Sequence, residues 1–169
     1  MNYRSITLAA TIISGVAAAG SAPAATAVRN HFSHGTANCQ SALPVFDTSI
    51  RKRPLALANE GSSTAFVTCD SENNEESFGG FQEVGVYFTN RGGSSGLTVS
   101  CTLVKGSFNA SGYIPKSTAA IPAAGYGSIT WTLADNGGVY YPAAAVSCGL
   151  PPGVDISLVN FKYIEQVGA

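Results

Sequence analysis

The stretch Gly96-Leu97-Thr98-Val99-Ser100-Cys101-Thr102-Leu103-Val104 alternates apolar and polar side chains with a period of two residues. Successive side chains of an extended chain point to opposite faces, so this pattern predicts a β-strand with one buried face and one solvent-facing side. The apolar face carries Leu97, Val99, Cys101 and Leu103. The opposite face carries hydroxyl groups in place of charges, because its residues are Thr98, Ser100 and Thr102.

The same alternation recurs in 82–88 and in 127–133. In the second of these ranges it predicts that Trp131 packs in the core beside Ile129. Weaker strand candidates are Leu43–Phe46, Leu55–Ala58, Thr64–Cys69, Ala144–Cys148 and Ile156–Ile164. Turn-forming residues separate the candidates at 59–62, 90–93, 106–112, 135–138 and 150–153. We therefore expect an all-β fold, a single antiparallel β-sandwich or jelly roll of about seven to nine short strands.

The composition excludes several classes of protein. Charged residues make up 11% of the 169 residues, against about a quarter in ordinary globular proteins, and the formal net charge is −1. A nucleic-acid-binding surface needs a basic excess, so we expect no nucleic-acid partner. A hydrophobic fraction of 45% with so little net charge also excludes a disordered chain.

The first 27 residues have the layout of a secretory signal peptide. Arg4 supplies the positive start, an uncharged stretch follows, and Ala25-Thr26-Ala27 has the small-x-small pattern of a cleavage site. We expect cleavage after Ala27, which leaves residues 28–169 as one domain with no membrane span. The predicted location of this domain is secreted or periplasmic.

The four cysteines agree with export. Cys39, Cys69, Cys101 and Cys148 are even in number and widely spaced, without the close pairs that zinc sites use. In an oxidising compartment they predict two disulfides, for which three connectivities are possible. We favour Cys39–Cys69 with Cys101–Cys148, because each pair joins neighbouring strand candidates.

Several short motifs together resemble a family of small, uncharacterised exported bacterial proteins. The motifs are Val67-Thr68-Cys69, Thr98-Val99-Ser100-Cys101-Thr102-Leu103, Cys148-Gly149-Leu150-Pro151-Pro152-Gly153 and Tyr163-Ile164-Glu165. They follow Cys39 near the expected mature start and span most of the mature chain. The resemblance implies a secreted β-sandwich, and it implies no activity and no catalytic residues.

One acidic segment is the best candidate for a metal site. Asp70, Glu72, Asn74 and Glu76 place carboxylate and amide oxygens at alternate positions after Cys69, and Ca²⁺ prefers such oxygen ligands. The segment lacks the glycine and the flanking helices of a helix–loop–helix calcium site. A solvated loop is the competing interpretation, so Ca²⁺ is the one cofactor considered, and otherwise none is expected.

Other candidate chemistry is incomplete. Tyr140-Tyr141 follow two glycines and are the best candidates for an exposed aromatic pair that contacts a ligand. The run 92–96 reads G-x-S-x-G, but no His follows it, because His31 and His34 both precede it. The basic run 51–53 precedes Pro54 and suits the edge of a sheet or an anionic partner.

We expect a binding or surface-associated protein with no catalytic residues and no enzymatic activity. Its partner would be a polysaccharide, another cell-envelope component or a cell-surface protein, recognised by loops on a disulfide-supported scaffold. Two alternatives stay open. One is a hydrolase that uses paired carboxylates from different strands, and the other is a structural subunit that assembles by strand exchange at an exposed edge.

Overall fold

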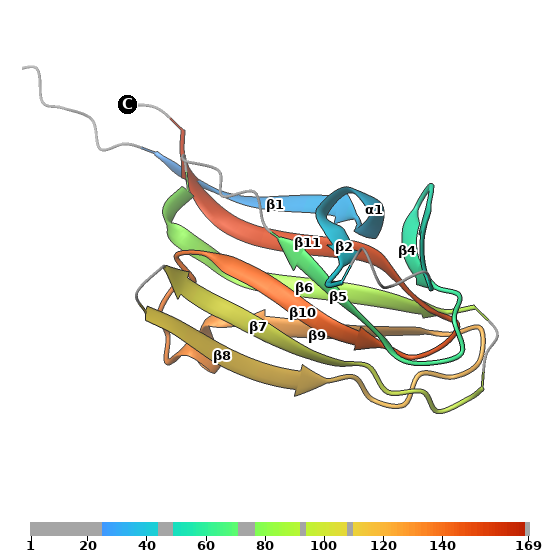
Figure 1. Ribbon diagram of the computed structural model, residues 1–169. Coiled ribbons are helices and arrows are strands. Elements are labelled where there is room, and N and C mark those ends of the chain that lie inside the picture. Colours follow the sequence, from blue (N-terminus) through green and yellow to red (C-terminus); the bar gives the residue numbers. More distant parts are fainter. Residues whose placement is uncertain (1–24, 44–48, 71–76, 92–93, 108–109, 168–169) are drawn as a thin grey trace, which may run out of the picture.

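The computed structural model describes residues 25–43, 49–70, 77–91, 94–107 and 110–167. These residues form eleven strands in two antiparallel sheets that pack against each other (Figure 1). The prediction of an all-β sandwich is therefore confirmed, although the described residues contain more strands than the expected seven to nine.

The six-stranded sheet contains the longest strands. Its order is β3–β4–β11–β6–β9, and β1 pairs with β11 beyond the end of β4. On one side, β11 pairs along most of its length with β6; on the other, it pairs first with β4 and then with β1. The strands are β1 (Thr26–His34), β3 (Ile50–Arg53), β4 (Ala56–Asn59), β6 (Ser77–Asn90), β9 (Tyr126–Thr132) and β11 (Val154–Gln166).

The five-stranded sheet has the order β2–β5–β10–β7–β8. Its strands are β2 (Cys39–Ser41), β5 (Ala65–Asp70), β7 (Ser100–Ser107), β8 (Ala110–Ser117) and β10 (Ala144–Leu150). The short helix α1 (Gly35–Asn38) carries the chain from β1 to β2, and the 3₁₀ helix η1 (Leu133–Asn136) follows β9. Apart from the hairpins β3–β4 and β7–β8, consecutive strands lie in opposite sheets.

The core lies between the two sheets and is built from the apolar positions of the alternating strands. Val99, Cys101 and Leu103 are buried as predicted, and Trp131 is fully buried. Each buried aliphatic or aromatic side chain contributes about 1.5–3 kcal/mol through removal of its apolar surface from water. The largest fully buried side chains are Trp131, Tyr141, Phe81, Phe88, Phe161, Leu57, Leu103, Ile121, Leu150 and Ile156.

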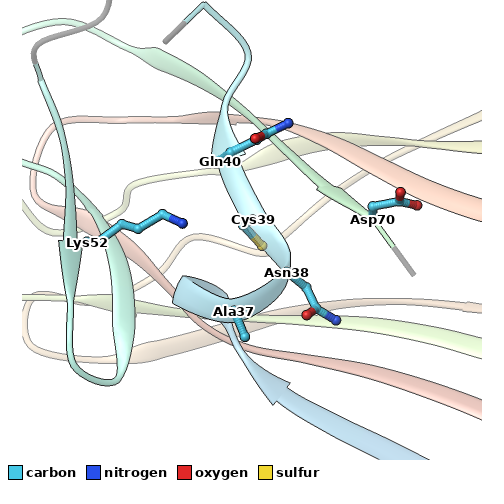
Figure 2. A pocket seen from close by; sticks show the side chains of 6 residues that line it. All are labelled: Ala37, Asn38, Cys39, Gln40, Lys52 and Asp70. Carbon is cyan, nitrogen blue, oxygen red and sulfur yellow. The ribbon is translucent and has the colours of Figure 1, made fainter. Parts of the chain in front are cut away.

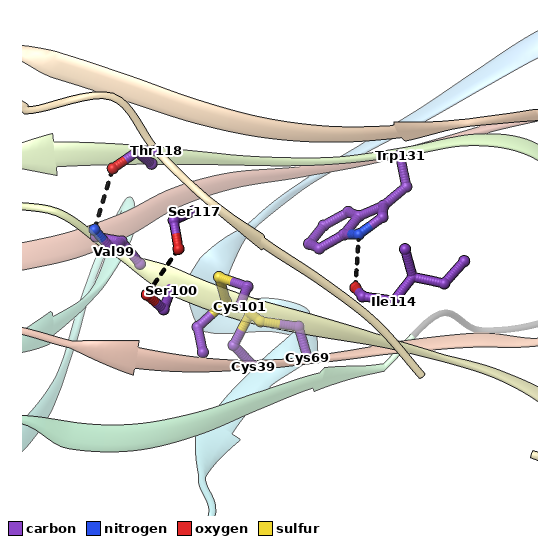
Figure 3. Close-up of a disulfide and its surroundings, with 10 residues drawn as sticks. Cys39, Cys69, Val99, Ser100, Cys101, Ile114, Ser117, Thr118 and Trp131 are labelled. Carbon is purple, nitrogen blue, oxygen red and sulfur yellow. Dashed lines mark hydrogen bonds between the residues drawn. A yellow bond between two sulfur atoms is a disulfide. The ribbon is translucent and has the colours of Figure 1, made fainter. Parts of the chain in front are cut away.

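Where the edge strands β8 and β9 lie next to each other, a side chain of each strand donates a hydrogen bond to a backbone carbonyl of the other. The Trp131 indole Nε1–H donates to the carbonyl oxygen of Ile114 over 2.9 Å (Figure 3). The Lys116 Nζ donates to the carbonyl oxygen of Thr130 over 2.8 Å. These bonds occupy backbone acceptors that an edge strand would otherwise leave open to another chain.

Both predicted disulfides are present. Cys39 bonds to Cys69 across β2 and β5, and Cys101 bonds to Cys148 across β7 and β10. In each pair the two residues lie directly opposite each other on adjacent strands, with their side chains on the inner face of the five-stranded sheet (Figure 3). Two covalent links therefore join four of the five strands of this sheet.

Local predictions differ from the structure at four places, and the first is the strand expected over 96–104, because β7 begins only at Ser100. The segment 106–112 was expected to be a turn, but β7 extends to Ser107 and β8 begins at Ala110. β1 was not expected, because most of its side chains are exposed and it lacks a buried alternating face. Leu43 is exposed and lies in a bend rather than in a strand, and the rest of the 43–46 candidate falls outside the described residues.

Gly35 allows α1 to lie close against β11. A Cβ atom at this position would lie 2.3 Å from the carbonyl oxygen of Ile156, so a side chain has no room.

Among the residues that the structure describes, no helix has the length and apolarity to cross a bilayer.

Candidate functional site

The outer face of the five-stranded sheet presents a regular array of polar side chains. Alternate residues of β2, β5 and β10 are buried, so the residues between them face solvent. The strand register aligns these outward residues in rows that cross the sheet. The central row is Gln40–Thr68–Ser147–Thr102–Pro115, flanked on one side by Phe66–Gly149–Ser100–Ser117 and on the other by Asp70–Ala145–Val104–Tyr113. We call these thirteen residues the hydroxyl face.

The hydroxyl face is almost free of charge. Asp70, at its corner, is the one ionisable acid or base among the thirteen apart from the Tyr113 phenol. The lysines of β7 and β8 belong to the inner side: Lys105 bonds to Asn136 of η1, and Lys116 bonds to Asp135. Part of the low charge of the sequence is therefore explained by this face, which offers hydroxyl groups as hydrogen-bond donors and acceptors in place of charges.

Two aromatic rings stand on this face. The side chains of Phe66 and Tyr113 are 60% and 67% exposed. The Phe66 ring lies beside Gly149 of the neighbouring strand, since a Cβ atom at Gly149 would lie 3.5 Å from the ring. The two residues are three strand spacings and four residues apart, so at ~4.8 Å per strand and ~3.3 Å per residue their Cα atoms lie about 20 Å apart.

The two disulfides lie directly beneath the hydroxyl face. The Cys101–Cys148 bond joins the central strands β7 and β10, next to Thr102 and Ser147. On the outer side, Ser100 and Ser117 are joined by a hydrogen bond of 2.8 Å between their hydroxyl oxygens (Figure 3). The disulfide and this hydrogen bond hold the polar groups of neighbouring strands at a set spacing.

The predicted calcium ligands are only partly described. Asp70 is exposed at the end of β5, and the other three, Glu72, Asn74 and Glu76, lie outside the described residues. Asp70 lines a hollow of about 230 Å³ that also contains Lys52 and Gln40 (Figure 2). The described residues contain no group of three His, Cys, Asp or Glu side chains that could hold a metal ion.

The predicted tyrosine pair is divided between surface and core. Tyr141 is fully buried, so the expectation that it is exposed is wrong. Its hydroxyl donates to the carbonyl oxygen of Thr132 over 2.6 Å, and burial raises its pKa to about 12. Tyr140 is half-buried and lines a hollow of about 380 Å³ beside Lys105 and Val139. Adjacent residues of an extended chain face opposite ways, which explains the division.

Three carboxylates of β11 and η1 have cationic partners. The Asp155 Oδ2 lies 2.6 Å from the Arg91 Nε, and the Glu165 Oε2 lies 2.5 Å from the Arg29 Nε. Asp135 pairs with Lys116 at 2.7 Å. Burial raises the pKa of Asp155, and the charge of Arg91 opposes this rise.

Two further motifs lie on edge strands. His31 and His34 are exposed in β1, and the basic run forms β3, an edge strand in which Arg53 pairs with Glu60.

Sequence reasoning did not single out Phe66. The signal was present in 64–69, where Ala65, Val67 and Cys69 take the buried face and leave Phe66 on the polar one.

The fold and the hydroxyl face together define a disulfide-linked all-β sandwich whose five-stranded sheet carries almost no charge on its outer face. No family model and no curated protein matches the chain. Among solved structures, that of TmCBM61 in complex with β-1,4-galactotriose is similar at a TM-score of 0.26, with 13% sequence identity. The match covers 83% of this chain and 88% of that chain.

Proposed function

We propose that the protein is an exported, non-catalytic binding module for a neutral polysaccharide, which it binds across the hydroxyl face. The observation that carries the proposal is the face itself, with its aligned hydroxyl groups, its near absence of charge and the exposed rings of Phe66 and Tyr113.

The chemistry of the face suits a sugar polymer. Ser and Thr hydroxyls donate and accept hydrogen bonds, as sugar hydroxyls do, and the C–H faces of sugar rings pack on aromatic side chains. Charged ligands would find almost no counter-charge on the face. A ligand that reaches both Phe66 and Tyr113 must span about 20 Å, so the geometry favours an oligomer or polymer over a monosaccharide.

Export is part of the proposal. Two disulfides in a small domain are stable in oxidising compartments and rare in the cytosol. They support the predicted leader peptide and its removal after Ala27. Mass spectrometry of the protein from culture medium or periplasm tests this directly, because the proposal expects Val28 as the first residue.

Binding is tested with purified protein against a panel of soluble and insoluble neutral polysaccharides. We expect retention on at least one of them, with Phe66→Ala and Tyr113→Ala each weakening the affinity about five-fold through loss of an aromatic contact. Tyr126→Ala is the matched control, because this side chain is 79% exposed on β9 of the other sheet. Equal losses for all three variants, or retention on none of the polymers, would overturn the proposal.

Tyr140→Ala distinguishes binding at the hydroxyl face from binding in the hollow that Tyr140 lines. If the ligand occupies the hydroxyl face, this variant keeps the affinity of the parent. A loss confined to Tyr140→Ala would instead place the ligand in the hollow beside Lys105 and Val139.

A further inference from the structure

β1 presents a long edge to solvent. It pairs with β11 over all nine of its residues, and no described strand pairs with its other side. Seven of the nine residues are exposed, and they include two large apolar side chains, Val28 at 55% and Phe32 at 57% exposure. Unpaired edges of this length are sites where a second chain adds to a sheet.

The direction of the backbone groups on this edge follows from one hydrogen bond. The Val167 N–H donates to the Ala25 carbonyl oxygen over 2.8 Å, so residue 25 turns its backbone groups toward β11. These groups alternate along an antiparallel strand, and the odd-numbered residues of β1 therefore bond to β11. The N–H and C=O groups of the even-numbered residues Val28, Asn30 and Phe32 point away from β11.

This outward edge is complementary to itself. When two copies run antiparallel about a two-fold axis through Asn30, Val28 lies opposite Phe32 of the partner subunit, and Asn30 lies opposite Asn30 of the partner subunit. All of these positions are even-numbered, so each pair falls in the hydrogen-bonding register. The pairing also brings each exposed valine against an exposed phenylalanine, an apolar pair that stabilises antiparallel strands.

The other edge strands carry features that discourage pairing. Pro115 lies in β8, and the carbonyls of Ile114 and Thr130 on β8 and β9 accept side-chain hydrogen bonds. β3 would bring like charges together through Arg51 and Arg53, and β2 is three residues long. Among the strands that the structure describes, β1 is the edge without such protection.

We infer that two copies of this chain associate through antiparallel pairing of β1 with β1, which joins their six-stranded sheets into one continuous sheet. The pairing needs residues 28–32 alone, so removal of residues 1–27 leaves it intact. A single strand pair buries a small area, and the dimer is therefore weak and forms at micromolar concentrations or above. Two hydroxyl faces in one particle would bind a polymer with greater avidity than one.

Sedimentation velocity over a concentration series measures the association. We expect a reversible monomer–dimer equilibrium that Asn30→Pro weakens at least ten-fold, because each copy loses the outward N–H at the centre of the pairing. The N–H groups that bond to β11 are untouched by this substitution. Leu55→Ser is the control: it removes an equally exposed apolar side chain from the β3–β4 turn and leaves the equilibrium unchanged.

Disulfide trapping tests the register without relying on the proline variant. Under mild oxidation, Asn30→Cys crosslinks two copies, because paired positions lie within disulfide reach on the two-fold axis. Val28→Cys remains uncrosslinked, since its counterpart lies four residues away along the partner strand. A wild-type chain that stays monomeric up to about 1 mM, or equal crosslinking by the two cysteine variants, would refute the inference.

Discussion

Removal of the Cys101–Cys148 disulfide gives the sharpest test of how the five-stranded sheet is stabilised. The perturbation is the double substitution Cys101→Ala/Cys148→Ala, which unlinks the two central strands β7 and β10. The cysteines are 47 residues apart in the chain. In the chain-entropy account, closing a loop of that length stabilises the folded state by about 4 kcal/mol at 25 °C.

The same relation predicts a similar effect for the second disulfide. Cys39 and Cys69 are 30 residues apart, which corresponds to about 3.6 kcal/mol. The total stability of a domain of this size is about 5–15 kcal/mol, so either loss is a large fraction of it. Affinity for a polysaccharide should fall with the first variant more than with the second, because β7 and β10 form the middle of the hydroxyl face.

Equilibrium unfolding in guanidinium chloride measures both losses, with tryptophan fluorescence as the signal. Trp131 is the one tryptophan of the chain and is fully buried, so its emission reports the opening of the core. A loss below about 1 kcal/mol for Cys101→Ala/Cys148→Ala would contradict the reasoning, because it would mean that the cross-link constrains the unfolded chain hardly at all.

Three further predictions concern single residues. The stability of Asp155→Asn relative to the wild type should increase as the pH rises above about 3.8. Burial raises the pKa of Asp155 in the folded state, so the proton it binds stabilises the wild-type fold only at lower pH. Urea unfolding at about pH 3 and pH 7 measures the difference in free energy of unfolding. Gly80→Ala should lower the free energy of unfolding by at least about 2 kcal/mol, since φ is +108° and a Cβ would lie 2.1 Å from the Tyr141 carbonyl oxygen. Gly137→Ala is the comparison: its φ is +64° but the space around it is open, so it should lower the free energy of unfolding by about 1 kcal/mol. Tyr141→Phe should cost about 1–2 kcal/mol in thermal unfolding through loss of the hydrogen bond to the Thr132 carbonyl oxygen, and an unchanged melting temperature would argue against that bond.

The sequence alone predicts the parts of the fold that follow from local periodicity. The strand around Leu103 and the burial of Val99 and Trp131 follow from alternation, and the disulfide pairing seen in the structure is the one favoured among three possible connectivities. β1 could not be found in this way, because a strand exposed on both faces leaves no periodic signal. β8 was hidden by Gly112 and Pro115, which are typical of turns.

The candidate site depended on topology that the sequence does not show. Within each strand, alternation places Thr68, Thr102 or Ser147 on the solvent-facing side, but it does not relate one strand to another. That the three form one row follows from the strand order β5–β10–β7, which brings together segments far apart in the chain. Phe66 and Tyr113 become a pair only when that order is known.

A nuclear magnetic resonance titration tests the central claim most directly. Amide shifts are followed while an oligosaccharide from a retained neutral polymer is added to the purified domain. We predict that the shifts concentrate on β5, β7, β8 and β10, with the largest changes near Thr68, Thr102 and Ser147, and that β9 and β11 are unaffected. Shifts confined to the six-stranded sheet, or to the hollow beside Tyr140, would contradict binding at the hydroxyl face.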